Sequence, residues 1–476
     1  MEDLEMIQDH ADESQGVPNL EMPASYMYQD DLWKSDYDFL FDTYNGCGGY
    51  KRGAYLVKHP REVFFKERQT IGFFRNFFKP IANAKVDPIF SQKINRQSDS
   101  EMFDLFVNDC TNSKTPLHTF MRDVNREASV QDLTFIVMDN FQDLSNLEAE
   151  NIKNRKIPYV YEKTADQVID WEVDQFGNIL SIVFIDKKVK DKGTEKQLYR
   201  RWDSQESQLL EMSGDSWVAY EQPIVHGLGI IPVYALRYQK YSAKKGFIPQ
   251  SQMYDLAKMN WTLFNVDSEL RYTQRKQALS ILKITGIEGN TDDIKVSTDN
   301  ALCLPPGGDA DYIEPDPNIP KEVREYINSL KENLFAIAEQ IGVTGVKNAD
   351  SGIAKEWDFR AHENILKTNA EISKIAELWI ADVFKKYTDT TFDYDPTYRF
   401  DYSPIATQSR IDVLEQYILQ PNIPVSGKKM ALQEMTKAVF SDNDPLKVKE
   451  VVEDIEKESD DAFQEDNEVN TDVELG

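Results

Sequence analysis

Three long segments in the C-terminal half of the chain carry apolar residues three or four positions apart, which predicts three long helices separated by two breaks. Ser251–Lys283 can form one helix of roughly 50 Å at ~1.5 Å per residue. The turn-rich residues 286–317 follow, and a second helix then begins with Pro320 in its first turn, where proline is tolerated. The glycine-punctuated residues 342–352 precede a third helix over about 354–388. Because helices this long with one apolar side need a partner surface, we expect a large obligate interface rather than a monomer.

The rest of the chain combines helical and extended patterns, so the predicted fold class is α+β, mainly α. Residues 25–145 have mainly helical patterns, with one amphipathic segment beginning at Pro60 and another over Pro116–Asp143. Short β-branched and aromatic runs between residues 157 and 238 alternate with turn residues, which predicts an antiparallel sheet. The third long helix is expected to bury an apolar stripe: Trp357, Ala361, Ile365, Ile372, Ile375, Trp379 and Val383. Shorter helices are expected near 408–419, 426–439 and 445–457, with Ser426 and Asp442 as caps of the last two.

The chain is strongly acidic, with a formal net charge of -28 over 476 residues. Nucleic-acid-binding proteins are usually basic, because neutralised phosphates supply much of their affinity, so this chain is a poor candidate for gripping nucleic acid. Two interpretations of the charge stay open: simple solubility, or a surface past which a polyanion moves without sticking. Met1–Gly16 and Glu458–Gly476 carry acids but no Lys or Arg, which predicts disordered tails.

Several classes of protein are disfavoured by what the sequence lacks. Cys47, Cys110 and Cys303 are far apart, which supports neither a disulfide framework nor a zinc site. No secretory signal and no apolar stretch long enough to span a membrane is found, so a protein of a reducing cytoplasm is expected. No nucleotide-binding or hydrolase motif is present either. We therefore expect no catalytic residues, no cofactor and no metal.

Two local patterns invite a sharper interpretation. Acid pairs such as Asp292 with Asp293 could suggest a two-metal nuclease, but they lie in expected turns without buried flanking strands. Arg68, Arg75 and Lys79 are interleaved with Phe residues, a pattern compatible with base stacking. An amphipathic helix with aromatic packing is the favoured explanation of that segment.

Seven phrases occur in the order found in portal proteins of tailed double-stranded DNA bacteriophages, and the chain resembles one large siphophage group of that family. In chain order they are YLVKHPREVFFKERQTIGFFRN, RKIPYVYEKTADQVIDWEVDQFG, LGIIPVYALRY, SQMYDLAKMNWTLFNVDSELR, ALSILKITG, DYIEPDPNIPKEVREYINSLKENLFAIAEQIGV and SGIAKEWDFRAHENILKTNAEI. The resemblance covers roughly residues 25–440. It depends on the order of the phrases, since none of them is a catalytic signature.

The resemblance implies a portal fold with wing, stem, clip, tunnel loop and crown. The implied divisions are an acidic tail at 1–24, the wing of helices and sheet at 25–250, the first stem helix at 251–285, the clip at 286–318, the second stem helix at 319–343, the tunnel loop at 344–353, the long wing helix and its connection at 354–404, crown helices at 405–457 and a second acidic tail at 458–476.

The implied function is that of a ring at the capsid vertex that conducts double-stranded DNA during genome packaging and ejection. The resemblance implies a dodecamer located in the virion, and in the host cytoplasm during assembly. Its implied partners, besides DNA, are terminase, the major capsid or scaffolding protein, and head-completion or adaptor proteins, with no membrane. Two alternatives stay open: another capsid-associated structural protein, such as a head–tail adaptor or minor capsid component, and a host cytosolic interaction protein.

The site residues that the resemblance implies fall in two loops. The tunnel candidates are Thr344, Val346, Lys347 and Asn348, and the clip candidates are Asp292, Asp293 and Lys295. Twelve copies of an acidic chain would repel DNA over about a Debye length, ~8–10 Å at ordinary salt, so that sparse cations could centre the duplex. Lys347 is the best candidate for such a ring of charge; the alternative is an ordinary solvated loop lysine.

Overall fold

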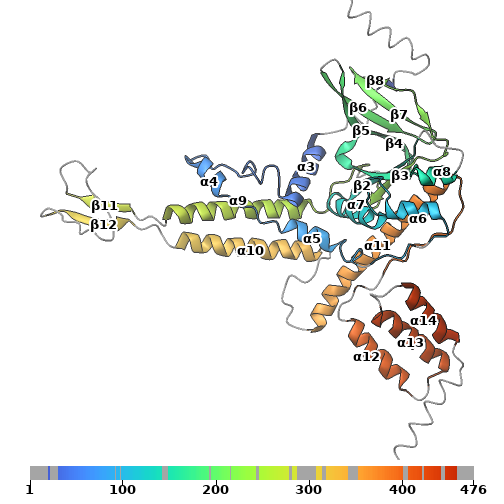
Figure 1. The fold of residues 1–476 in the computed structure, drawn as a ribbon. Helices are drawn as coiled ribbons and strands as arrows, with labels where there is room; N and C mark the ends of the chain where they lie inside the picture. The colour runs from blue at the N-terminus through green and yellow to red at the C-terminus, as the bar shows by residue number, and fades with distance from the viewer. Residues whose placement is uncertain are drawn as a thin grey trace, which may run out of the picture. The chain divides into compact units, whose positions relative to one another are not determined.

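The chain separates into two compact units, each described by itself. Unit 1 comprises Met1–Tyr28, Asn83–Pro249 and Asn348–Gly476, and unit 2 comprises Gln29–Ala82 and Gln250–Lys347. The computed structural model describes residues 20–21, 31–91, 93–96, 98–141, 148–191, 194–214, 216–242, 246–277, 281–286, 307–313, 318–340, 352–399, 402, 406–420, 423–440 and 445–457. The mixed α+β architecture expected from the sequence is confirmed (Figure 1).

Unit 1 contains the predicted antiparallel sheet region, divided into two sheets. The larger sheet has the order β1-β8-β7-β6-β5-β4, with β9 also paired to β7, and the smaller has the order β10-β2-β3. The strands are β1 (Leu20–Glu21), β2 (Leu133–Asp139), β3 (Tyr159–Thr164), β4 (Val168–Val173), β5 (Ile179–Asp191), β6 (Thr194–Trp202), β7 (Glu206–Ser213), β8 (Ser216–Ala219), β9 (Ile224–Val225) and β10 (Val233–Arg237). A short 3-10 turn, η1 (Ala165–Gln167), connects β3 to β4.

Two expectations about unit 1 were wrong. The segment Pro116–Asp143 is not helical throughout: α7 (Leu117–Gln131) ends at Asp132, whose φ of 60° is left-handed, and β2 follows. The acidic tail 1–24 is not free along its whole length, because Leu20 and Glu21 pair with Trp217 and Ser216 of the edge strand β8. An edge strand leaves unpaired backbone groups that even a two-residue segment can bind. The rest of that tail lies outside the described residues.

Helices cover the smaller sheet of unit 1 and build its core. Helices α7 and α11 (Gly352–Thr388) contact β2 and β10, and α6 (Glu101–Asn108) contacts α7; α8 (Glu148–Lys153) lies between β2 and β3 in the sequence. The amphipathic pattern expected for the segment from Pro116 is confirmed in α7, whose buried residues include Leu117, Phe120, Met121 and Val124. Phe103, Phe384 and Phe392 pack within one cluster of the core.

The predicted extent of the third long helix is confirmed, but only part of its expected stripe is buried: Val383 lies in the core and Ile372 and Trp379 pack against it. Ile375 is 57% exposed, whereas Leu366, Ser373, Glu377 and Ile380 are buried. The buried face therefore includes a serine and a glutamate, which a search for apolar residues passes over. Glu377 is held by Arg96, whose Nε and Nη2 donate to its two carboxylate oxygens at 2.6 and 2.8 Å.

The C-terminal helices agree closely with their predicted positions. They are α12 (Ala406–Ile418), α13 (Val425–Val439) and α14 (Pro445–Lys457), with α13 contacting both others. Pro424, not Ser426, precedes the first turn of α13, so the predicted cap there was wrong. The second predicted cap, Asp442, and the tail 458–476 lie outside the described residues.

The described residues of unit 2 form helices and one small hairpin. Its elements are α3 (Asp31–Asn45), α4 (Phe65–Ile71), α5 (Phe78–Ala84, which ends just inside unit 1), α9 (Tyr254–Gln277), β11 (Ile281–Thr285), β12 (Asp309–Ile313) and α10 (Asn318–Gln340). The amphipathic segment from Pro60 is not one long helix, because the chain is extended between α4 and α5, and Val63 is 83% exposed. The helix expected over Ser251–Lys283 ends earlier, at Gln277, and residues 281–285 form β11 instead.

Candidate functional site

Helices α9 and α10 of unit 2 lie side by side and run in opposite directions (Figure 1). Near one end of the pair, Phe77 contacts Phe335 of α10 with ring centroids 6.0 Å apart. At the other end, Gln274 of α9 and Arg324 of α10 line one surface hollow, which is described below. The apolar seam between the helices is buried: Leu256, Leu263 and Leu270 of α9, and Ile327, Leu330 and Leu334 of α10. Each such side chain contributes about 1.5–3 kcal/mol when fully buried, so the seam stabilises the pair.

The chain between these helices forms the antiparallel hairpin β11–β12. Ile281 is opposite Ile313 at its base and Thr285 is opposite Asp309 at its far end. Gly286, with φ of 80°, follows β11, and a Cβ there would approach Gly308 Cα at 3.0 Å. In the sequence, β11 thus follows α9 and its partner strand β12 precedes α10.

Polar side chains of α9 hold the backbone of the segment between α4 and α5. Asn260 Oδ1 accepts hydrogen bonds from the backbone N–H groups of Phe77 and Phe78 at 2.9 and 3.0 Å. Its Nδ2 donates to the carbonyl of Arg75 at 2.9 Å. Asn260 is 1% exposed, so these bonds are made away from water. They fix the segment in an extended form.

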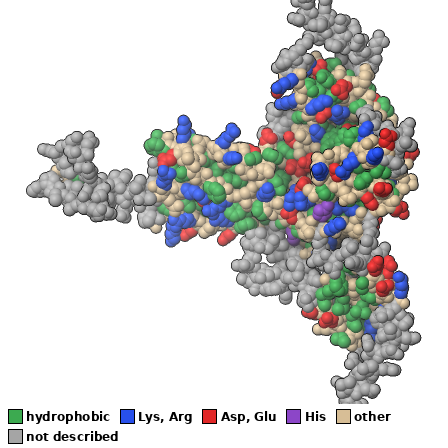
Figure 2. Space-filling model, viewed as in Figure 1, with side chains coloured by type: hydrophobic (Ala, Val, Ile, Leu, Met, Phe, Trp, Pro, Cys, Tyr) green, Lys and Arg blue, Asp and Glu red, His purple; other side chains and the backbone are tan. Residues whose placement is uncertain are grey.

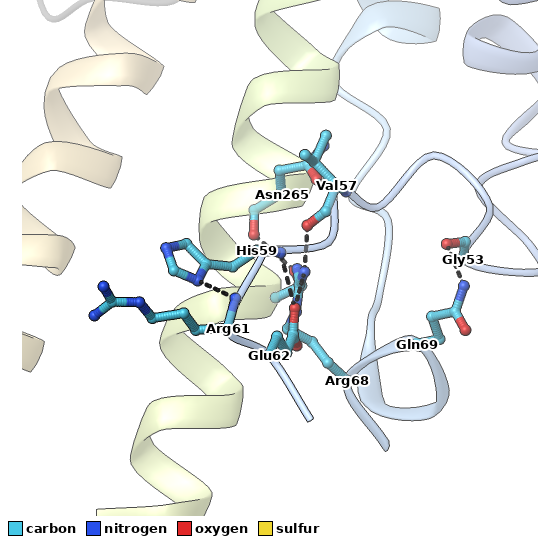
Figure 3. Close-up of polar contacts among 9 residues, drawn as sticks. Gly53, Val57, His59, Arg61, Glu62, Arg68, Gln69 and Asn265 are labelled. Atoms are coloured by element: carbon cyan, nitrogen blue, oxygen red, sulfur yellow. Dashed lines mark hydrogen bonds and ion pairs between the residues drawn. The ribbon is translucent and has the colours of Figure 1, made fainter. Parts of the chain in front are cut away.

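One turn further along α9, Asn265 holds the chain ahead of α4. Its Oδ1 accepts from the N–H of Val57 at 2.7 Å (Figure 3). Its Nδ2 donates to the carbonyl of Tyr55 at 3.2 Å. Trp261 Nε1 donates to the same carbonyl at 2.9 Å. The aromatic rings of Tyr50, Phe74 and the buried Phe264 pack beside these bonds.

Arg68 of α4 is a buried cation, with 2% of its surface exposed. Its Nε and Nη2 donate to the two carboxylate oxygens of Glu62 at 2.7 and 2.9 Å (Figure 3). Its Nη1 donates to Ser268 Oγ of α9 at 2.9 Å, and Nη2 also donates to the carbonyl of Val57. The hydrogen bonds from Arg68 lower the pKa of Glu62 below its ordinary value. The guanidinium of Arg68 is buried and donates to these partners, so it does not face a nucleic acid. The base-stacking interpretation of this segment is therefore wrong for Arg68.

A charged hollow of about 490 Å³ opens along the α9–α10 pair. It is lined by four cations, Arg75, Arg271, Arg324 and Lys331, and by one acid, Asp267. Lys and Arg side chains are visible over this part of the surface in Figure 2. Arg271 pairs with Asp267 on its own helix at 2.8 Å. The hollow thus has an excess of positive charge in a chain of net charge -28.

The site residues implied by the resemblance are not described by the structure. Thr344, Val346, Lys347 and Asn348, and the clip residues Asp292, Asp293 and Lys295, all lie outside the described residues. They remain predictions.

Sequence reasoning missed the polar residues of α9, Asn260, Asn265 and Ser268. The available signal was their position: each lies within the expected helix beside apolar residues of its inward side. Of the basic segment, only Arg75 lines the hollow, and Lys79 lies over the ring of Tyr44 at 4.9 Å.

Neither a metal-binding cluster nor a membrane-spanning helix occurs in the described part of the chain. No group of three or more His, Cys, Asp or Glu side chains there is arranged to hold a metal ion. No helix among the same residues is both long and apolar enough to cross a bilayer.

The chain was compared with known families, sequences and structures. Residues 252–371, from α9 into α11, match the family model described as a domain of unknown function (DUF4055). No curated protein was found to match the sequence. A chain from the virion of a native gene transfer agent particle is similar at 11% identity and a TM-score of 0.41, covering 75% of this chain and 88% of that one.

Two neck structures of gene transfer agent particles are similar to the same degree. In the native neck, computed with C12 symmetry, the matched chain has 12% identity and a TM-score of 0.44, with 79% of this chain and 94% of that one covered. In the empty neck, computed with C6 symmetry, identity is 10% and the TM-score 0.43, with 88% and 96% covered. Likenesses with TM-scores below 0.5 are too remote for an argument about this chain's fold or function.

Proposed function

We propose that this chain is a portal subunit that assembles into a ring and conducts double-stranded DNA through its axis. The observation that carries the proposal is the order α9, β11, β12, α10, α11. An antiparallel pair of long helices with a distal hairpin, followed by a still longer helix, corresponds to the stem, clip, stem and wing helix implied by the sequence resemblance. In this assignment the hairpin β11–β12 belongs to the clip that meets terminase and head-completion proteins.

The charge of the chain supports the same proposal. A channel for DNA needs weak contact with phosphates, since each neutralised phosphate adds to affinity and tight binding would stall transport. A net charge of -28 per copy favours passage over retention. In this proposal ATP hydrolysis belongs to a partner, which agrees with a sequence in which we find no nucleotide-binding motif.

The proposal is tested by imaging the purified full chain and measuring its mass in solution. We expect a ring with an axial channel and a mass of about twelve subunits. A small closed oligomer without a channel would favour a head–tail adaptor or minor capsid component and would overturn the portal assignment. If the purified chain is monomeric, adding empty capsids or their coat protein tests whether rings assemble only when these components are present. A chain that stays monomeric with them contradicts the proposal.

A further inference from the structure

The cations of the charged hollow are not neutralised within their own unit. Among the described residues, Arg75, Arg324 and Lys331 form no ion pair, and only Arg271 has a carboxylate partner, Asp267. Arg75 and Arg324 are exposed and Lys331 is half-buried at the edge of the helix pair. The hollow can therefore receive negative charge from outside the chain.

Helix α10 carries a matching set of acids on another side. Glu322, Glu325 and Glu332 are exposed, and none of them forms an ion pair in the described structure. Glu325 and Glu332 directly follow Arg324 and Lys331 in the sequence. Successive helix residues point about 100° apart, so the acids and the bases occupy two different flanks of α10.

We propose that the acidic flank of α10 in one copy of this chain docks into the charged hollow of the next copy. The contact is heterologous, because two different surfaces meet, and repetition of such a contact by rotation closes a ring. The proposal rests on the proposed function, which supplies the ring, and adds the surfaces that join its subunits.

The spacing along α10 fits a rotational arrangement. Arg324 and Lys331 are seven residues apart, and so are Glu325 and Glu332, which is about 10.5 Å at ~1.5 Å per residue. Copies related by rotation about an axis parallel to α10 place equivalent residues at the same height. Glu325 then lies within ~1.5 Å of the height of the neighbouring copy's Arg324 along the axis, and Glu332 lies within ~1.5 Å of the height of that copy's Lys331. The hollow, at about 490 Å³, has room for both carboxylate side chains.

Two charge-reversed chains test the contact. The first carries Glu325→Lys with Glu332→Lys, and the second carries Arg324→Glu with Lys331→Glu. Each alone juxtaposes like charges at every interface, so the concentration for half-assembly should rise at least about tenfold. The matched control, Glu450→Lys with Glu456→Lys on the exposed side of α14, makes the same change of net charge as the first chain and should assemble normally. Circular dichroism of each chain checks that α-helical content is unchanged.

Mixing the two reversed chains gives the decisive result. The first chain then offers a positive hollow and a positive flank, and the second offers a negative hollow and a negative flank. Each hollow again meets a flank of opposite sign if the two chains alternate, so mass measurements with one chain tagged should show assembly restored at a one-to-one ratio. A chain carrying all four substitutions should likewise assemble by itself.

The outcomes separate this contact from the proposed function. If both charge-reversed chains still form rings, the proposed function stands and the proposed contact is overturned. If mixing the two chains restores association but no closed ring forms, the proposed contact stands and the proposed ring is overturned. A wild-type chain that does not self-associate even with capsid components present overturns both. If the second chain assembles normally but loses retention on immobilised double-stranded DNA, the hollow binds phosphate and the contact is overturned.

Discussion

Arg68 shows how a buried charge can be stabilised by geometry. Removing a guanidinium from water costs several kcal/mol, and attraction to one carboxylate offsets this only when the remaining donors are satisfied as well. Here Glu62 accepts two hydrogen bonds, and Ser268 and the carbonyl of Val57 accept others. The partners come from the loop before α4 and from α9, so one side chain connects two segments about 200 residues apart in sequence.

Replacing Arg68 with Met should be strongly destabilising, because Glu62 would retain a poorly solvated charge without its partner. We expect the free energy of unfolding to fall by about 3–5 kcal/mol. Hydrogen exchange of the α4 and α9 amides, together with urea unfolding, measures the loss within unit 2. Arg122→Met is the control, since Arg122 is 33% exposed and pairs with its neighbour Asp123. Equal losses in the two variants would show that the Arg68 network adds nothing.

The pKa of Glu62 makes part of the stability depend on pH. Its pKa in the folded chain is below the ordinary value of 4.5, chiefly because Arg68 donates hydrogen bonds to it, so the unfolded chain binds the proton more tightly. The stabilisation is therefore complete above about pH 4.5 and is lost as the pH falls through the folded pKa. Glu62→Gln should lower the melting temperature most near pH 7, and the difference from wild type should shrink below about pH 4.5. A difference that is constant from pH 7 to pH 3 would refute this, and Glu450→Gln on α14 serves as the exposed control.

At the scale of elements, α9 acts as a template for a segment with little regular structure of its own. The chain from Tyr55 to Phe78 has only the seven-residue α4, and its backbone groups find partners on Asn260, Trp261 and Asn265. Buried backbone groups are costly when unpaired, which explains why α9 carries amides where apolar residues would otherwise lie. The segment from Val57 to Phe78 is ordered by α9 rather than by its own helix propensity.

Asn260→Ala should release the segment between α4 and α5 while leaving α9 itself intact. Three hydrogen bonds disappear and the buried N–H of Phe78 is left unpaired, so we expect a loss of about 2–4 kcal/mol. The measurement is hydrogen exchange of the amides of residues 77–80 relative to those of α9. Thr262→Ala removes only an exposed bond to the Lys258 carbonyl and should change little. Protection of residues 77–80 that survives Asn260→Ala would contradict the template role.

Sequence patterns predicted the elements whose burial follows apolar spacing and failed where polar residues are buried. The limits of α14 and the inward faces of α7 and α10 follow that spacing closely. The predicted face of α11 was right at Val383 and wrong at Ile375, because the buried face includes Ser373 and Glu377, which pair with distant partners that no local pattern reveals. For the same reason the segment from Pro60 appeared continuous: its break depends on Asn260, about 180 residues away. Likewise the hollow combines cations from three segments, so spacing within one segment could indicate only part of it.

At the scale of the whole molecule, the proposed assembly and the proposed DNA transport depend on charges of opposite sign. The proposed contact between copies uses a local excess of positive charge, while the chain as a whole is strongly negative. Such a contact is screened by salt, since its charges lie near the surface and the Debye length is ~8 Å at physiological ionic strength. The self-association of the purified chain should therefore weaken more with added salt than the packing of its apolar α9–α10 seam does.

The proposed DNA transport would use positive charge at a second place, which we expect at Lys347, outside the described residues. A DNA duplex carries one negative charge per ~1.7 Å, so an acidic ring repels it on all sides and a sparse ring of lysines can centre it without holding it. Lys347→Ala in all subunits should leave ring assembly unchanged and lower severalfold the amount of DNA packaged per assembled particle. Lys187→Ala, on the exposed end of β5, is the matched control and should package normally. Because packaging is counted per particle, an assembly defect would not imitate the effect; unchanged packaging by Lys347→Ala would leave Lys347 as an ordinary solvated loop residue.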